Sequence, residues 1–319
     1  RGKISDEQLE IIENGGILIN SENKIEEIGD YNVIATTSLR SGKQSQHSIT
    51  QSLNHSTSVV LPAFVDCHTH ICFGGNRAND FAMRNAGKTY LEIAEKGGGI
   101  WSSVQHTRNA SEEELLETLL QRINQLISLG ITTIEIKSGY GLNVESELKM
   151  LRVMKKAQEK TEATLVPTCL SAHLKPKDFE GTSSAYLQYI LDEILPKVKQ
   201  ENLAKRVDIF IEKSAFQPEE SRKFLENAKE KGFEITVHAD QFTAGSSRIA
   251  VEVGAISADH LEATIDEDIE FLANSETVAV ALPGASLGLG EPFTPARKIL
   301  DHNGILAIAS DWNPGSAPM

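Results

Sequence analysis

Eight short runs of apolar and β-branched residues, each followed by a helical pattern, limit the folds open to this sequence more than any other feature. Continuous apolar runs are typical of parallel strands that are covered on both faces. Eight of them with helices between predict an α/β fold, a (β/α)8 TIM-type barrel. A doubly wound sheet shares this alternation, but it usually carries a glycine-rich phosphate turn after its first strand, and this sequence has none there. The predicted strands are residues 60–65, 132–136, 164–170, 207–211, 233–237, 255–258, 277–282 and 305–309.

The clearest predicted helix begins after Ser111, which forms a capping-box pattern with Glu114. Leucines and isoleucines between Leu115 and Ile127 form one apolar stripe, and Gly130 ends the helix. The other predicted helices are residues 144–160, 184–203, 218–231, 246–253, 265–274 and 295–302.

The first 58 residues have a different pattern from the rest. Residues 16–20 and 24–28 are short β-type runs separated by a turn, and residues 38–57 are polar enough for a surface loop. Two such strands are too few to form a stable sheet alone. The sequence therefore predicts a partial small β domain over residues 1–58 and the barrel over residues 59–319.

The charge and cysteine content restrict the partners. The chain has 45 acidic and 31 basic residues and a formal net charge of −14, which disfavours nucleic acid and anionic membranes as partners. Three cysteines cannot form a disulfide framework, and no apolar run is long enough to span a membrane. We therefore expect a cytoplasmic protein that acts on a small molecule.

Histidines and aspartates cluster at the ends of the predicted strands, where a barrel carries its active site. His68 and His70 are two residues apart on an extended segment, so both rings project from one face. Together with His238 after the fifth strand and Asp311 after the eighth, they form a plausible shell for one Zn²⁺ or iron ion. Taken alone, a His-x-His pair is more often a surface or turn feature.

Other polar residues at the same ends are candidates for proton transfer and substrate binding. His260 and Asp311 are the natural groups to handle protons beside the metal, and for His260 we favour this role over that of a buried, hydrogen-bonded structural histidine. Arg77 could bind a substrate carboxylate, or it could be an ordinary loop charge. For Tyr140 and His173, residue type and position alone do not decide between a functional and a structural role. Cys67 and Cys72 flank the histidine pair and are better explained by packing.

The longer strings resemble the imidazolonepropionase family of the amidohydrolase superfamily. The resemblance extends in order from about residue 60 to the end of the chain, and the string around Tyr140 is far more specific than His-x-His. The strings are residues 64–70 (FVDCHTH), 73–77 (FGGNR), 135–142 (EIKSGYGL), 238–241 (HADQ), 257–261 (SADHL) and 310–315 (SDWNPG).

This resemblance implies metal-dependent hydrolysis of 4-imidazolone-5-propanoate to N-formimino-L-glutamate, a step of histidine degradation. It implies that His68, His70, His238 and Asp311 bind one Zn²⁺ or Fe ion per chain. Arg77 and Tyr140 would hold the propanoate, while His173 would contact the ring carbonyl and Gln241 the ring nitrogens. Asn313, Gly315 and Ser316 would close the pocket. In the implied mechanism Asp311 or His260 takes a proton from water, and His173 helps to stabilise the oxyanion.

The sequence differs from the family pattern at two positions. It also ends earlier than the family pattern does. Family members can carry glutamate at position 241, and Gln241 cannot accept a proton. Ala63 stands where many relatives have glycine. The family also continues past the eighth strand to complete the small β domain, so we expect this chain to lack that C-terminal half. A homodimer is the assembly that the resemblance suggests.

Two alternatives remain. A different amidohydrolase could act on another cyclic amide or deaminate a small ring, using two metals and a carbamylated lysine after the fourth strand. Lys213 is close to that position, but strand alternation places it opposite Asp208 and Glu212. The chain could also be a barrel-fold binding protein without catalysis, although all four predicted metal positions are filled.

Overall fold

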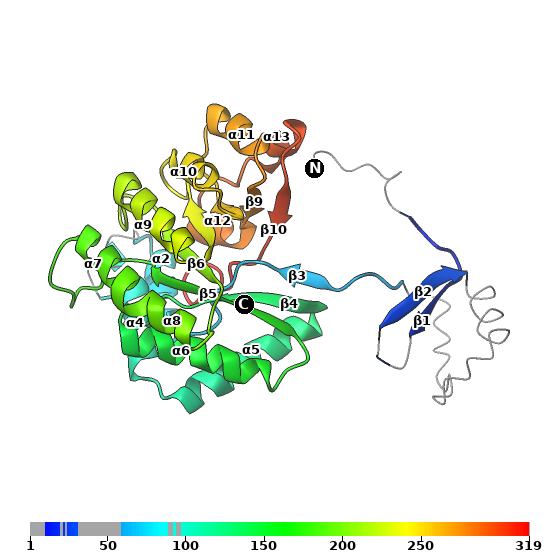
Figure 1. Ribbon diagram of the computed structural model, residues 1–319, viewed down its shortest axis with the longest axis horizontal. Coiled ribbons are helices and arrows are strands. Elements are labelled where there is room, and N and C mark those ends of the chain that lie inside the picture. The colour runs from blue at the N-terminus through cyan, green and yellow to red at the C-terminus, as the bar shows by residue number, and fades with distance from the viewer. Residues whose placement is uncertain are drawn as a thin grey trace. The chain divides into compact units, whose positions relative to one another are not determined.

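The computed structural model describes residues 10–19, 22, 24–30, 59–88, 92–93 and 97–318. The chain divides into two compact units, with the boundary between Pro62 and Ala63. The larger unit carries the barrel and the smaller one a two-stranded sheet (Figure 1). The predicted polar loop over residues 38–57 lies outside the described residues.

Among the described residues, eight strands form one sheet in sequence order, and every neighbouring pair is parallel. This arrangement confirms the predicted fold class. The strands are β3 (Phe64–Asp66), β4 (Ile131–Lys137), β5 (Thr164–Ala172), β6 (Arg206–Phe210), β7 (Glu234–Ala239), β8 (Ser257–His260), β9 (Val278–Ala281) and β10 (Leu306–Ile308).

The first and last strands approach each other just beyond their C-terminal ends. Thr69 and Trp312 form a parallel bridge there. The backbone N–H of His70 donates to the carbonyl of Trp312 at 2.8 Å, and that of Asp311 donates to the carbonyl of His68 at 3.0 Å. The barrel therefore closes at the two segments that carry three of the four predicted metal ligands, His68, His70 and Asp311.

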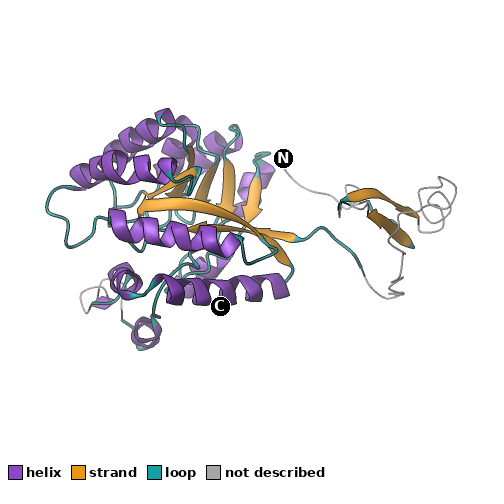
Figure 2. Ribbon diagram, turned by 60° about the horizontal axis from the view of Figure 1, so that its bottom comes forward, coloured by secondary structure: helices purple, strands orange, loops and turns teal. Residues whose placement is uncertain are grey.

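Helices surround the strands on the outside (Figure 2). The capping box at Ser111 is present, with both of its hydrogen bonds, at the start of α5 (Glu112–Ser128). The other α-helices of the described residues are α2 (Ala78–Asn85), α4 (Ile100–Asn109), α6 (Val144–Gln158), α7 (Ser183–Tyr189), α8 (Leu195–Gln200), α9 (Pro218–Glu230), α10 (Ser246–Glu252), α11 (Asp266–Ala273), α12 (Pro283–Leu289) and α13 (Ala296–Asp301).

The helix expected over residues 184–203 is interrupted. A π-helical turn, Ile190–Ile194, separates α7 from α8, and Pro196 lies in the first turn of α8. Proline has no N–H to donate to the preceding turn, so a regular α-helix cannot continue through it. The sequence also gave no prediction for α12, because its two glycines have low helix propensity.

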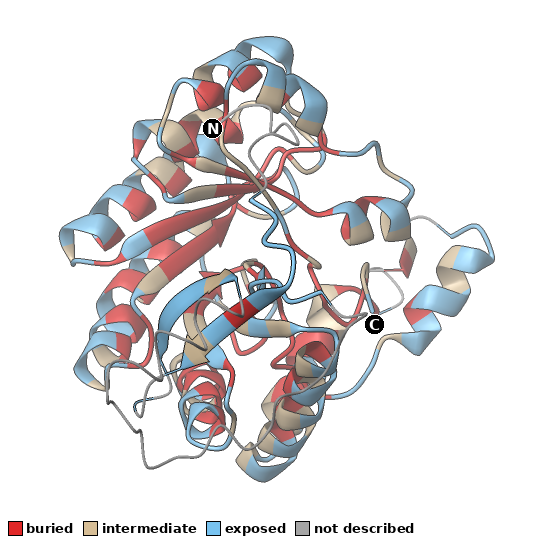
Figure 3. Cartoon of the chain, turned by 90° about the vertical axis from the view of Figure 1, so that its right-hand side faces the viewer, coloured by how far each residue is buried: buried red, intermediate tan, exposed pale blue. Residues whose placement is uncertain are grey.

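The apolar residues of the strands and the inner helix faces form the core (Figure 3). The first strand differs from its prediction. β3 spans only three residues, and Val60, Leu61 and Phe64 are exposed. In the smaller unit, β1 (Gly15–Ile19) pairs with β2 (Ile25–Asp30) in antiparallel fashion. No helix of the described residues is long and apolar enough to cross a membrane.

Candidate metal centre and its surroundings

Four side chains that the sequence selected as metal ligands meet at the carboxyl end of the barrel. His68 and His70 follow β3, His238 lies in β7, and Asp311 follows β10. Nε2 of His70 is 3.2 Å from Nε2 of His68 and 3.2 Å from Nε2 of His238. Oδ1 of Asp311 is 3.4 Å from Nε2 of His68 and from Nε2 of His70. Nε2 of His70 is therefore close to ligand atoms of all three other residues, and His68, His70 and Asp311 together form one group that could hold a metal ion.

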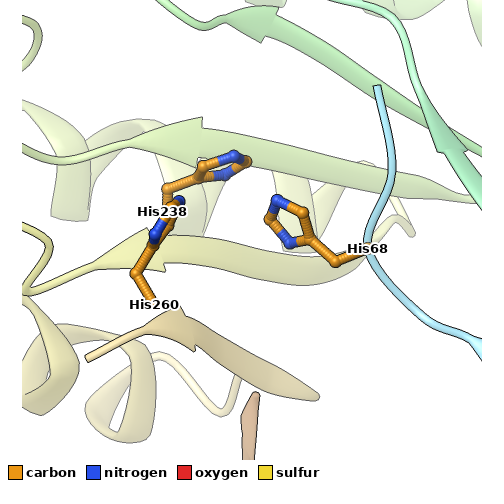
Figure 4. Close-up of side chains that lie close together, drawn as sticks. All are labelled: His68, His238 and His260. Carbon is orange, nitrogen blue, oxygen red and sulfur yellow. The ribbon is translucent and has the colours of Figure 1, made fainter. Parts of the chain in front are cut away.

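Acidic partners orient two of these rings. Nδ1 of His68 lies 2.7 Å from Oδ2 of Asp259, and Nδ1 of His238 lies 3.0 Å from Oδ2 of Asp208. A proton held on Nδ1 by a carboxylate leaves the Nε2 lone pair free to bind a metal. Figure 4 shows the rings of His68 and His238 facing a common space, together with that of His260.

The residues fit a metal ion by their spacing and by their unsatisfied atoms. Ligands about 2.0–2.1 Å from Zn²⁺ at the corners of a tetrahedron are about 3.3–3.4 Å apart, close to the observed separations. Oδ1 of Asp311 is buried and makes no hydrogen bond within the described residues. A buried carboxylate oxygen surrounded by imidazole nitrogens is costly without a cation or a proton, so the cluster is suited to a metal.

Burial controls the protonation of the cluster when it is metal-free. It lowers the pKa of His238 to about 4 and holds the pKa of His68 and His70 well below the usual value. It raises the pKa of Asp311 to about 7, against the opposing charge of His260. The rings are therefore neutral at neutral pH, as metal binding requires.

His260, at the end of β8, is close to the same cluster. Its Nδ1 lies 3.5 Å from Oε2 of Glu262. Burial alone would lower its pKa, but Glu262, Asp311 and Asp259 outweigh burial and raise it. Its Nδ1 or Nε2 also falls within 4.8 Å of a ligand atom of His68 and of His238, so these three histidines form a second possible metal-binding group.

The backbone is strained at two of these strand ends. His260 has φ of 87° and Asp311 has φ of 50°, values that non-glycine residues rarely adopt. Such conformations cost about 1–3 kcal/mol each and tend to occur at functional sites. Here they turn the chain sharply where the side chain meets the cluster.

Arg77 lies in the segment after β3, and its Nε donates to Oδ2 of Asp80 at 2.7 Å. Its guanidinium lies directly against Gly315, where an added Cβ would be 2.2 Å from Nη1. Arg84 of α2 donates to the carbonyls of Gly288 and Gly315. Sequence reasoning missed Arg84, because nothing local to α2 marks it as a link between distant loops.

Tyr140 and His173 are buried beside the histidine cluster. The His173 ring stacks on that of His70 with centroids 5.4 Å apart, and Tyr140 lies 5.4 Å from His173. Nδ1 of His173 is 3.0 Å from the carbonyl of Gly139, which can only accept, so Nδ1 carries the proton. Burial lowers the pKa of His173 to about 3, so its Nε2 is an acceptor at neutral pH.

Asn313 organises the loop after β10. Its Nδ2 donates to the carbonyl of Asp311 and to Oγ of Ser316, and its Oδ1 accepts from the backbone N–H groups of Gly315 and Ser316. The amide of Asn313 is thus fully used inside the loop. Gln241 is half-buried in the loop after β7, next to Asp240.

Asp240 was not singled out from the sequence, yet it anchors that loop. Its carboxylate accepts from Ser246, Ser247 and Thr264. Lys213, the residue of the two-metal alternative, is exposed beyond the end of β6. Burial raises the pKa of Cys67 and of Cys72 to about 12, which keeps both as thiols and supports their interpretation as packing residues.

Comparisons with known proteins show the family of this chain. The model of the amidohydrolase family matches residues 59–305. The imidazolonepropionase of Fusobacterium nucleatum is 42% identical over 98% of this chain and 74% of its own length. That of Bacillus cytotoxicus is 47% identical over 82% of this chain and 62% of its own length. The chain belongs to the imidazolonepropionase family. The family predicted from the sequence strings is thereby confirmed.

Solved structures show the same fold at low identity. Atrazine chlorohydrolase TrzN from Arthrobacter aurescens TC1, complexed with zinc, is 16% identical with a TM-score of 0.65 and covers 98% of this chain and 71% of its own. Guanine deaminase from C. acetobutylicum, with bound guanine, is 14% identical with a TM-score of 0.62, and the match covers 99% of this chain and 74% of its own. These likenesses show that the chain has the same barrel fold.

Proposed function

We propose that this chain hydrolyses the cyclic amide of 4-imidazolone-5-propanoate to N-formimino-L-glutamate in histidine degradation. The clustering of His70 Nε2 with Nε2 of His68, Nε2 of His238 and the Asp311 carboxylate carries this proposal. Membership of the imidazolonepropionase family supplies the substrate. A binding protein without catalysis would not need an aligned set of metal ligands with its own acidic partners.

The metal would be a single Zn²⁺ or iron ion held by His68, His70, His238 and Asp311. When bound, it supplies Lewis-acid activation of water and of the ring carbonyl. Asp311 would accept the proton of the attacking water. His260, held by Glu262, would keep the proton that the departing ring nitrogen needs, because its raised pKa favours the protonated ring.

Arg77 would hold the propanoate group through its guanidinium. Its positive charge would attract the anionic substrate locally, against the net negative charge of the protein. Tyr140 would contact the same group. His173 would accept an N–H of the imidazolone ring at Nε2, since Nδ1 is committed to Gly139. This role replaces the expected contact with the ring carbonyl oxygen. Gln241 would orient the ring without taking a proton.

Asn313 would influence substrate binding indirectly, because its side chain fixes the loop in which Gly315 and Ser316 lie. Gly315 and Ser316 would form the wall of the pocket. Access by a small anion agrees with the net charge of −14 only if Arg77 and the metal overcome it locally.

The test combines turnover of 4-imidazolone-5-propanoate with metal analysis of the same sample. Asp311→Asn is expected to lose most bound metal and to lower kcat/KM by at least about 100-fold, because a neutral amide is a poor metal ligand and a poor base. Asp301→Asn, at an exposed aspartate of α13, should leave both the metal content and kcat/KM unchanged. An Asp311→Asn protein with full metal and near-normal turnover would contradict the assignment.

A further inference from the structure

One face of helix α2 carries two charged side chains, Asp80 and Arg84, which are four residues apart. Residues at this spacing are neighbours on the surface of an α-helix. Oδ2 of Asp80 accepts from Nε of Arg77 at 2.7 Å and from the backbone N–H of Gly99 at 2.8 Å. Arg84 donates to the backbone carbonyls of two distant segments. The same face of α2 therefore contacts the predicted substrate-binding arginine and these two segments.

The two hydrogen bonds of Arg84 connect helix α12 to the loop after β10. Nη1 donates to the carbonyl of Gly288 in α12 at 2.6 Å, and Nη2 donates to the carbonyl of Gly315 in the loop at 2.8 Å. A guanidinium holds its donors in a rigid plane, so one side chain fixes the spacing of two acceptors. The helix and the loop also touch directly, because Gly288 has no room for a Cβ beside the carbonyl oxygen of Ser316. Arg84 thus holds a junction of three segments together.

This junction includes the residue that packs against Arg77. Gly315 lies directly against the Arg77 guanidinium, where a Cβ would collide with Nη1. Arg84 holds Gly315 at its carbonyl, and Asp80 holds Arg77 at Nε. Both partners of the contact between Gly315 and Arg77 are therefore anchored to the same helix, and the place of the guanidinium depends on both anchors.

Arg84 is half-buried and lies close enough to Arg77 for the two positive charges to interact. Burial, followed by the charge of Arg77, lowers the pKa of Arg84, while Asp80 acts in the opposite direction. A contribution of Arg84 to substrate binding can therefore arise from its charge or from the two carbonyls that it holds. Lysine at this position separates the two, because it keeps the charge but has a single Nζ in place of the planar fork.

We propose that Arg84 is a positioning residue for Arg77, because its paired hydrogen bonds hold the loop at Gly315 against α12 and so fix the place of the Arg77 guanidinium. This inference rests on the proposed function, which supplies the carboxylate that Arg77 binds. It adds to that function a residue that acts on the substrate through another side chain.

The experiment compares Arg84→Lys and Arg84→Met with wild type in steady-state kinetics on 4-imidazolone-5-propanoate. Both variants are expected to raise KM at least about 10-fold with a much smaller change in kcat, because the charge-assisted pair of hydrogen bonds is lost in each. Arg297→Lys, at an exposed arginine of α13, is the matched control and should leave KM unchanged. An Arg84→Lys protein with the KM of wild type would overturn the proposal, because charge alone would then be sufficient.

A mutant cycle tests whether Arg84 acts through Arg77. In an Arg77→Ala background, Arg84→Lys is expected to change KM by less than about 2-fold, because the group that Arg84 positions is no longer there. A rise in KM as large as the one in the wild-type background would overturn the proposal.

Hydrogen exchange of the loop gives a second readout that needs no turnover. The backbone N–H groups of Gly315 and Ser316 both donate to Oδ1 of Asn313. We expect them to exchange at least about 10-fold faster in Arg84→Lys than in wild type or Arg297→Lys, because the loop opens more often without its anchor. Unchanged exchange at both amides would overturn the proposal. A wild-type chain that does not hydrolyse the substrate would fail the proposed function, while the exchange rates would still decide whether Arg84 holds the loop.

Discussion

At the scale of single residues, the contact between Gly315 and Arg77 sets where the predicted substrate-binding cation lies. The guanidinium occupies the space that a side chain at position 315 would need, and Asp80 holds its other side at Nε. Among the described residues, the Nη atoms of Arg77 make no hydrogen bond, so they can form a paired contact with a carboxylate. Glycine at 315 is therefore a condition for the position of Arg77.

Gly315→Ala should displace the Arg77 guanidinium, because the new Cβ would lie 2.2 Å from Nη1. Charge-assisted hydrogen bonds contribute about 1.5–3 kcal/mol, so we expect KM to rise at least about 10-fold with a smaller change in kcat. Steady-state kinetics of Gly315→Ala, Arg77→Ala and the double variant form a mutant cycle. Effects that simply add would show that the glycine does not act through Arg77.

At the scale of elements, the first turn of α6 holds the loop that follows β4. Oε1 of Glu147 accepts from the N–H groups of Gly141 and Leu142, both at 2.8 Å, and Oε2 lies 3.1 Å from Oγ of Ser171. Glu147 is fully buried. One carboxylate thus ties together the loop that carries Tyr140 and the end of β5 that leads to His173.

Glu147→Gln replaces one acceptor oxygen by an amino group that would face backbone donors. We expect the loop to loosen and kcat/KM to fall about 10-fold or more, with most of the change in KM, because Tyr140 and His173 lose their support. Glu145→Gln, on an exposed position of the same helix, is the matched control. Equal kinetics for the two variants would count against this role.

At the scale of the whole molecule, the metal cluster joins strands from opposite ends of the sequence. His68, His70 and Asp311 come from the segments that close the barrel, and His238 comes from the middle of the sheet. Metal bound there would stabilise closure, since a ligand that binds only the folded state raises the free energy of unfolding.

Thermal unfolding should therefore show a higher Tm with excess Zn²⁺ than with a chelator, and the difference should shrink as the pH falls. Asp311 must lose its proton to bind, and burial raises its pKa to about 7 in the metal-free protein. Below pH 7 protons compete with Zn²⁺ at this carboxylate, whereas His238 begins to compete only near pH 4. The check is the Tm difference at pH 8, 7 and 6. A constant difference over this range would contradict the assigned role of Asp311.

Much of the site could be predicted because it follows local rules. Apolar runs of parallel-strand type set the barrel, and a barrel gathers its strand ends, so His68, His70, His238 and Asp311 could be grouped without coordinates. The capping box of α5 is likewise a property of residues three apart. The interruption at Ile190–Ile194 could not be predicted from the apolar pattern, since that pattern continues across it.

The sequence by itself determined the barrel, its strand order and the types of side chain at the carboxyl ends of its strands. Strand periodicity and the residues that follow each strand are local properties of the sequence. Only the tertiary structure decided how these groups are paired. Lys137 meets Asp208 and Asp259 across the barrel interior, and Glu262 meets His260 beyond β8. The protonation state of each histidine depends on those neighbours and on burial, and both are set by the packing of distant strands.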